Sequence, residues 1–287
     1  MNNLVLMCYW VINMKKFYTA KYDRVFKTIL CDEDNPHMMQ EFLSRLLNRK
    51  VEIVKFLRNE LPIRNTEEKV KTIDVLVKSE NKYIHIELNT NYENWLHIRN
   101  FVYFSTVFTK KTKRGEVYDT ESEFIHIDFT YNLDIDDEFK KYYVMSDDGH
   151  KYIDNVEIIE YNMDKIMQFW YDLDEKKINE YKHLIMLDLE SSDLKKISKG
   201  DEFMEEFENK LTNLNEDETF QSAMTYEEDQ KLILNTTKKY AYEQGVKEKE
   251  NDIVINMLNK NCDISFISDI TKLSLEEIDK IKNENNL

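Results

Sequence analysis

Two runs of alternating apolar residues, VKTIDVLVKS at 70–79 and KYIHIELNT at 82–90, constrain the fold of this chain most strongly. An alternation with a period of two is typical of β-strands that bury one face. The two residues that separate the runs, Glu80 and Asn81, are enough for a tight turn, so the pattern predicts an antiparallel hairpin. Its apolar side chains then pair across the strands: Ile73 with Leu88, Val75 with Ile86, and Val77 with Ile84. This face belongs to a core.

The opposite face of the hairpin carries two acids. In the same register Asp74 faces Glu87, and Asn89 follows one step further along. The other two pairs on this face are Leu76 with His85 and Lys78 with Tyr83. Like charges about 5 Å apart destabilise a sheet, so something must offset the repulsion. A divalent cation held by both carboxylates would do so. The alternative is a solvated face on which a nearby Lys or Arg screens the pair.

The remaining patterns alternate between helix and strand. Apolar residues recur at helical spacing in 23–48, where Asn35 and Pro36 separate two helices. Another helix is expected over 92–111. The residues that recur there at helical spacing are Trp95, Ile98, Val102, Phe104 or Ser105, and Phe108. Strand-like runs lie at 51–57, 123–133, 141–145 and 155–163, and helices dominate from Lys165 onward. This order predicts an α/β fold with a mixed central sheet flanked by helices and a mostly helical C-terminal region.

Charge is distributed unevenly in this chain of 287 residues, whose net charge is −16. Residues 1–114 hold 20 Lys and Arg against 13 Asp and Glu, whereas 115–287 hold 20 against 43. A basic first half is suited to a polyanion such as DNA, and an acidic second half would solubilise or shield it. A merely solvated acidic tail explains the same asymmetry.

The cysteines and the N-terminal stretch argue against several classes of protein. The three cysteines are far apart and form no CxxC spacing, which favours a reducing cytoplasm over a disulfide scaffold or a cysteine-based metal site. The apolar stretch MNNLVLMCYWVIN is shorter than the ~20 residues of a membrane span and has no basic leader, so we expect no membrane association. Residues 1–13 are either translated from an upstream start codon or form an additional strand.

The C-terminal residues 251–287 predict a small helix-turn-helix. Ser274 and Glu277 form the capping box that begins its last helix. Such units pack against partners or other helices more often than they bind DNA, and the acids on this one, Asp269, Glu276, Glu277 and Asp279, favour packing.

Several motifs together carry a family resemblance. They are Asp23, Phe26 and Lys27 in a D-x-x-FK pattern, Asp74 and the E-x-N of Glu87 and Asn89, Arg99 and Tyr103 in R-x-x-x-Y, and a tail matching at Ala241 to Gly245 and Thr271 to Ile278. In their order and spacing these motifs resemble the PD-(D/E)xK nuclease superfamily, and within it the Rpn-type recombination-promoting nucleases or putative transposases. The resemblance implies a restriction-endonuclease-like core, and spans nearly the whole chain.

The resemblance also implies roles for individual residues. Asp74 and Glu87 would bind Mg²⁺, with Mn²⁺ as a possible substitute, and face one solvent-accessible cleft. Asn89 stands where the superfamily commonly has lysine and the Rpn-type branch has glutamine, and an amide supplies no charge to the phosphate. Lys27 is the predicted second source of positive charge, although a surface lysine fits equally. Glu41 is a further predicted metal ligand. Asp23 either holds the first helix near the site or caps it.

The predicted DNA contacts follow the hairpin. They are Arg99, Tyr103, Lys110, Lys111, Lys113 and Arg114. Cations that reach a groove are what phosphate binding requires, although a solvated helix end has the same composition. His126 and Asp128 share a strand face, and we expect this pair and His85 to be structural.

We therefore expect four segments: an N-terminal extension (1–14), a nuclease-like domain (15–190), an acidic helical region (191–243) and a C-terminal helical module (244–287). The predicted function is Mg²⁺-dependent cleavage of DNA, in the context of mobile elements, recombination or phage defence. The alternative is a catalytically weakened fold that binds DNA or a protein, with a regulatory acidic half that also serves dimerisation through the C-terminal helices. A purely structural interaction protein would leave the basic half without a role.

Overall fold

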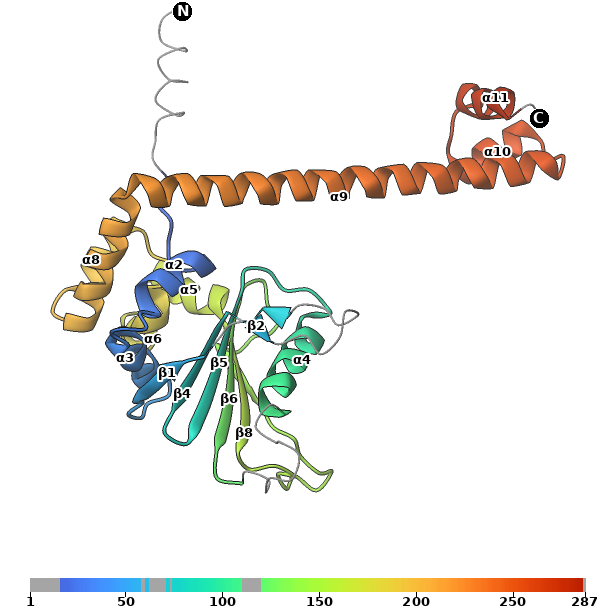
Figure 1. Cartoon of the computed structure of the whole chain (residues 1–287). Helices are drawn as coiled ribbons and strands as arrows, with labels where there is room; N and C mark the ends of the chain where they lie inside the picture. Colours follow the sequence, from blue (N-terminus) through green and yellow to red (C-terminus); the bar gives the residue numbers. More distant parts are fainter. Residues whose placement is uncertain (1–15, 58–59, 62–70, 73, 110–119, 286–287) are drawn as a thin grey trace, which may run out of the picture. The chain divides into compact units, whose positions relative to one another are not determined.

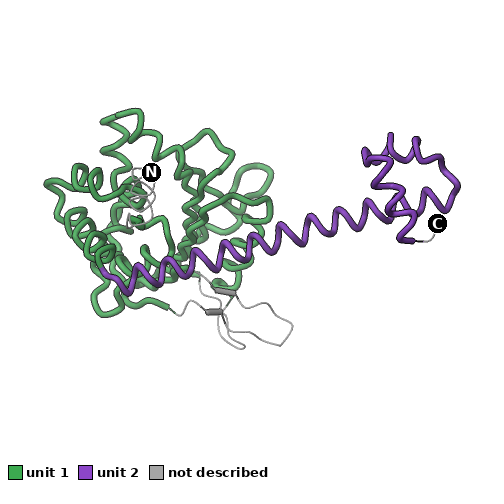
Figure 2. Tube along the Cα trace, turned by 90° about the horizontal axis from the view of Figure 1, so that it is seen from above, with its two compact units in different colours: residues 1–216 green, residues 217–287 purple. Residues whose placement is uncertain are grey.

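The computed structural model describes residues 16–57, 60–61, 71–72, 74–109 and 120–285. The expected extension at 1–14 and Ile73 of the hairpin lie outside these residues. The chain divides into two compact units, residues 1–216 and 217–287 (Figure 2).

A six-stranded mixed sheet is the centre of the first unit (Figure 1). Its spatial order is β1 (Ile53–Phe56), β4 (Val75–Ser79), β5 (Lys82–Asn89), β6 (Glu123–Thr130), β8 (Val156–Asn162) and β7 (Phe139–Tyr142). Strands β5, β6 and β8 run parallel to one another, and the remaining pairs are antiparallel. A separate ribbon pairs β2 (Glu60–Leu61) with β3 (Lys71–Thr72). The predicted α/β class with a mixed sheet is confirmed.

The predicted hairpin is present in the predicted register. Val75 pairs with Ile86, Leu76 with His85, Val77 with Ile84 and Lys78 with Tyr83. A two-residue connection between Ser79 and Lys82 joins β4 to β5. Register here follows from the alternation, because a slip by one residue would turn the isoleucines away from the core.

The apolar face of the sheet packs against the first two helices, α2 (Asp23–Leu30) and α3 (His37–Leu46). The rings of Phe26 and Phe42 both contact Phe129 of β6, with centroids 6.4 and 6.0 Å from it. All three side chains are fully buried, so they anchor the helices to the middle of the sheet.

The opposite face is polar, yet it is also buried. Helix α4 (Leu96–Thr109) covers it and buries four residues: Leu96, Asn100, Phe104 and Val107. The helix is present as predicted, and of the residues that indicated it, Trp95, Ile98 and Val102 are exposed. The reason is that the sheet face beneath α4 carries acids, so the helix presents Asn100 to Asp128 instead of an aliphatic side chain.

Four further helices complete the first unit: α5 (Met163–Tyr171), α6 (Glu175–Ile185), α7 (Ser191–Ser198) and α8 (Glu202–Glu216). Helix α8 buries Phe203, Met204, Phe207 and Leu211 and contacts α2 and α3. The Asn215 side chain accepts from the backbone amide of Tyr18 at 2.7 Å. Residues 191–216 therefore group with the sheet, and the two compact units divide at 216/217.

The second unit consists of a 42-residue helix, α9 (Glu218–Asn259), and two short helices, α10 (Ile264–Thr271) and α11 (Leu275–Glu284). A small core of Val254, Ile267, Ile278 and Ile281 joins the three. The capping box of Ser274 and Glu277 is present at the start of α11, as predicted.

Replacing Ser274 with alanine should loosen α11. Loss of a serine N-cap costs about 1 kcal/mol, which corresponds to about a fivefold larger equilibrium constant for opening of the helix and about fivefold faster amide exchange. Amide hydrogen exchange of the full chain measures this, with the amides of β5 and β6 as an internal control. Unchanged exchange in α11 would mean that the capping box does not hold the helix.

Among the residues that the structure describes, none of the helices combines the length and the apolar character needed to span a bilayer.

Candidate active site

The two hairpin acids lie side by side where β4 begins. The backbone amide of Asp74 lies 3.3 Å from Glu87 Oε1, and the amide of Leu88 donates to Asp74 Oδ2 at 2.8 Å. The Asp74 side chain is 20% exposed, whereas that of Glu87 is only 4% exposed. Water therefore reaches the pair from the Asp74 side, because α4 and its side chains cover Glu87.

The pKa of Asp74 reflects this crowding. Burial, which contributes most, and the charges of Glu87 and Asp23 raise the pKa of Asp74 to about 7, although the hydrogen bond from Leu88 and the charge of Lys27 act in the opposite direction. Without a bound cation the pair thus holds a proton that an isolated aspartate would release. A pKa raised in this way is typical of a functional site in which buried carboxylates lack enough positive charge to balance them.

The raised pKa of Asp74 predicts how metal-free stability depends on pH. Folded Asp74 binds a proton up to a pH of about 7, whereas unfolded aspartate releases it near pH 4. The free energy of unfolding should therefore fall as pH rises from about 4 to about 7, and Asp74→Asn should remove this contribution. Denaturant unfolding in a chelator at pH 5 and pH 8 measures it. The variant should gain stability relative to wild type at pH 8, and an equal difference at both pH values would contradict the assignment.

Lys27 of α2 lies beside Asp74. Its Nζ is 2.7 Å from Asp23 Oδ1 and 3.4 Å from Asp74 Oδ1. Burial opposes the charged form, but the hydrogen bond to Asp23 and the charge of Asp74 outweigh it and raise the pKa of Lys27. The structure thus brings together Lys27, Asp23 and Asp74. Asp23 makes no N-cap hydrogen bond and instead holds the lysine in position.

Arg99 of α4 reaches the site from the opposite side. Its Nη2 donates to Asn89 Oδ1 at 2.6 Å and lies 3.4 Å from Glu87 Oε2. Asn89 in turn donates from Nδ2 to Asp128 Oδ1 at 3.2 Å. Both ends of the Asn89 amide are therefore engaged. Its oxygen holds the Arg99 guanidinium next to Glu87, and its nitrogen donates to Asp128.

Tyr103, predicted as a DNA contact, lies next to Arg99. Its ring centroid is 5.7 Å from the guanidinium carbon, and the Trp95 ring lies at the same distance. Two aromatic rings thus orient Arg99 by cation–π contact. The predicted contacts Lys110, Lys111, Lys113 and Arg114 lie outside the described residues.

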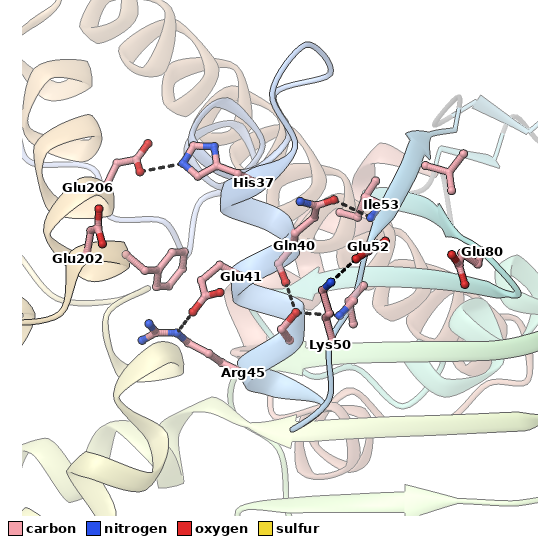
Figure 3. A pocket seen from close by; sticks show the side chains of 14 residues that line it. His37, Gln40, Glu41, Arg45, Lys50, Glu52, Ile53, Glu80, Glu202 and Glu206 are labelled. Atoms are coloured by element: carbon pink, nitrogen blue, oxygen red, sulfur yellow. Dashed lines mark hydrogen bonds and ion pairs between the residues drawn. The ribbon is translucent and has the colours of Figure 1, made fainter.

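Glu41 was predicted as a further metal ligand, but the structure does not place it beside Asp74 and Glu87. It pairs with Arg45 at 2.7 Å on α3 and lines another pocket together with His37, Lys50 and Glu206 (Figure 3). Its contacts in the described part of the chain include neither hairpin acid. Helix α3 turns this face toward α8, so its spacing in the sequence was no guide to the metal ligands.

A row of acids across the parallel strands is the feature that sequence reasoning missed. Glu87, Asp128 and Glu160 are direct neighbours in β5, β6 and β8, and all three are buried. A signal was present: IHIELN at 84–89 and IHIDFT at 125–130 repeat the same pattern. In parallel strands such a repeat aligns His85 with His126 and Glu87 with Asp128.

Each of the additional acids has its own partners. Asn100 donates to Asp128 Oδ1 at 2.6 Å, and His126 Nε2 lies 3.0 Å from Asp128 Oδ2. Glu160 lies 3.0 Å from His97 Nε2 and accepts from the Tyr142 hydroxyl at 2.9 Å. Of the four acids, Asp74 is the most exposed to water, since its side chain is 20% accessible against 4% or less for the other three.

The donor set of Asp74 and Glu87 suits a hard divalent cation. Mg²⁺ takes carboxylate oxygens from one or two residues and completes its octahedron with water and substrate phosphate. Among the described residues no group of three or more His, Cys, Asp or Glu side chains is arranged to hold a metal ion.

Comparison with known proteins agrees with this geometry. A family model described as PD-(D/E)XK nuclease family transposase matches residues 20–244, which include the whole sheet and the hairpin acids. Comparisons with curated proteins and with solved structures give no significant match. The match covers most of the chain, and the chain belongs to the PD-(D/E)XK nuclease family transposases.

Proposed function

We propose that this protein is a divalent-metal-dependent DNA endonuclease that acts on behalf of a mobile element. The observation that carries the proposal is the pair of Asp74 and Glu87, which lie side by side at the start of β4 with Lys27 and Arg99 on either side. The PD-(D/E)XK family membership supports a nuclease, and nucleases of this family generally use divalent metals. By the same resemblance, its context is recombination or phage defence.

Asp74 and Glu87 would hold the cation, Mg²⁺ with Mn²⁺ as a substitute. Bound there, it would polarise the phosphodiester and acidify the attacking water. The raised pKa of Asp74 means that the cation has to displace a proton, so its affinity should increase as pH approaches 7. Lys27, whose Nζ lies 3.4 Å from Asp74 Oδ1, would contact the phosphate beside the cation.

Arg99 is the residue that we propose stabilises the charge on the phosphate. Asn89 has no charge to offer, but its oxygen accepts a 2.6 Å hydrogen bond from the guanidinium. Arginine remains protonated at any working pH and can contact two phosphate oxygens at once. On this proposal Asn89 acts as a positioning residue for Arg99, and the charge that a lysine would carry in the strand comes from α4 instead.

DNA would approach along α4. Arg99 lies in its first turn and Tyr103 in its middle, and Lys110, Lys111, Lys113 and Arg114 follow it in the sequence. We propose that these four basic residues bind the phosphate backbone on both sides of the cut, because cations are what sequence-independent contacts to DNA require.

Plasmid nicking tests this function. Wild-type protein should convert supercoiled plasmid to the nicked form in Mg²⁺ or Mn²⁺ and stop when a chelator is added. A chain that nicks equally well in the chelator would overturn the metal-dependent reading, and one that never nicks with either ion would overturn the nuclease reading.

A second proposal is favoured by the engagement of Asn89, which leaves no free amide to orient water. On this reading the chain binds DNA or a protein without cutting, and the acidic C-terminal part regulates binding. Exposed apolar residues of α9, including Leu232, Ile233 and Leu234, support a homodimer through the C-terminal helices. Tight DNA binding without nicking, together with a concentration-dependent dimer in sedimentation, would favour this alternative.

A further inference from the structure

A closed ring of hydrogen bonds holds Arg99 of α4 against β5 and β6. Arg99 Nη2 donates to Asn89 Oδ1 at 2.6 Å. Asn100 Oδ1 accepts from both Nε and Nη2 of the same guanidinium, at 3.0 and 2.9 Å. The nitrogens of the two asparagines then meet at one atom, because Asn89 Nδ2 and Asn100 Nδ2 donate to Asp128 Oδ1 at 3.2 and 2.6 Å. Arg99 and Asp128 are thus joined twice, through two amide side chains.

The direction of every bond in this ring follows from the arginine. A guanidinium only donates hydrogen bonds and stays charged, so the amide atom that faces Arg99 is the oxygen in both asparagines. The other end of each amide is then an NH₂ group, which needs an acceptor when it is buried. Asp128 Oδ1 is that acceptor for both of them.

Asp128 prevents the two amides from turning over. Asn89, Asn100 and Asp128 are all buried, so none of them can exchange its partner for bulk water. If either amide turned by 180°, its NH₂ group would face the guanidinium and its oxygen would face Asp128 Oδ1. Both contacts would leave buried polar groups unpaired, which is the costly arrangement inside a protein.

The ring leaves one nitrogen of Arg99 for a ligand. Nε and Nη2 are engaged, whereas Nη1 has no hydrogen-bond partner among the described residues. The Arg99 side chain is 30% exposed, so a phosphate oxygen can reach the two N–H groups of Nη1. Because two amide oxygens fix the plane of the guanidinium, the orientation of Nη1 is set before any substrate binds.

We propose that Asp128 is a positioning residue for cleavage. Through Asn89 and Asn100 it holds Arg99 so that Nη1 meets the phosphate as negative charge develops there. The inference rests on the proposed nuclease function and on the role given to Arg99 in it. Asp128 itself touches neither the substrate nor the cation and acts only through the ring.

Nicking kinetics of full-length variants test the inference. Asp128→Leu keeps a similar volume but offers no acceptor, so kcat should fall about tenfold with KM nearly unchanged. Asp128→Asn should stay within about threefold of wild type, because its oxygen can accept from both asparagines while its nitrogen lies beside His126. In an Arg99→Ala background Asp128→Leu should have no further effect on kcat, since the ring then has no guanidinium to hold.

Ile127→Ala is the control for lost stability. It opens a cavity at a fully buried position on the apolar face of the same strand and leaves the ring intact. We expect it to lower the thermal midpoint and yet to nick at the wild-type rate when both are measured well below that midpoint.

NMR of ¹⁵N-labelled arginine side chains gives a readout that does not need cleavage. The chain has seven arginines, and the signal of Arg99 is the one that Arg99→Lys removes. Its Nε–H should exchange slowly with water in wild type, in Asp128→Asn and in Ile127→Ala. Exchange should be about tenfold faster in Asp128→Leu, because Asn100 no longer holds its oxygen toward Nε.

The outcomes separate this inference from the proposed function. If wild type nicks while Asp128→Leu keeps both its kcat and its slow Nε–H exchange, the ring does not position Arg99 and the inference fails. Independent, additive losses in Asp128→Leu and Arg99→Ala would also overturn it. Should wild type never nick, the nuclease proposal fails, and faster exchange in Asp128→Leu alone would still support Asp128 as the residue that holds Arg99.

Discussion

Replacing Asp74 with asparagine or Glu87 with glutamine is expected to lower the rate of plasmid nicking about a thousandfold, equivalent to about 4 kcal/mol of activation free energy. Each variant keeps the shape of the side chain but removes one of two charges that we assign to the cation. The loss should be in kcat, because the cation stabilises charge that develops in the transition state. Single-turnover nicking at saturating Mg²⁺ measures it.

The matched control is Glu52→Gln, which removes an exposed acid that pairs with Lys50 and lies outside the site. It should nick at the wild-type rate. If Asp74→Asn and Glu87→Gln also cut at that rate while wild type is active, the assignment of the hairpin acids is wrong, whatever the family of the chain.

Removing the charge of Arg99 is expected to have the second largest effect. Arg99→Ala should lower kcat on the order of a hundredfold, because preorganised groups that stabilise a transition-state charge contribute about that much. Arg99→Lys should recover part of the rate, since it restores the charge but not the planar fork that contacts Asn89 and Glu87.

The division between kcat and KM distinguishes the two roles that Arg99 could have. A residue that only binds the DNA backbone would raise KM and leave kcat nearly unchanged. A fall in kcat with little change in KM supports the catalytic role. The thermal midpoint should be measured in parallel, because Arg99 also neutralises a buried acid.

The hairpin and its acids could be predicted because their information is local. The alternation in 70–79 and 82–90 sets the faces, and the two-residue turn sets the register, so the opposition of Asp74 and Glu87 follows from a few residues. Lys27 and Asp23, one helical turn apart, could likewise be paired from spacing alone.

The partners of the hairpin could not be predicted in the same way. Arg99 meets Asn89 only because α4 lies on the polar face of the sheet, and the apolar residues of that helix gave the opposite expectation. Asp128 and Glu160 join the site through parallel pairing of strands that lie far apart in the sequence. The alignment of IHIELN with IHIDFT would have revealed the first of them.

The grouping of residues 191–216 with the sheet also could not be predicted from composition. Residues 191–216 are rich in charge, which suggests a solvated helix, but α8 also carries an apolar stripe that packs on α2 and α3. Composition averaged over a segment conceals such a stripe, whereas burial reveals it.

Calorimetric titration of the metal-free full chain with Mn²⁺ tests the central claim most directly, because it asks whether the hairpin acids hold a cation before any DNA is present. Wild type should bind Mn²⁺ with an affinity that increases between pH 6 and pH 7.5, as Asp74 loses its proton. Asp74→Asn and Glu87→Gln should each abolish this binding, and Glu52→Gln should leave it unchanged. Binding of equal strength in wild type and in both hairpin variants would contradict the account.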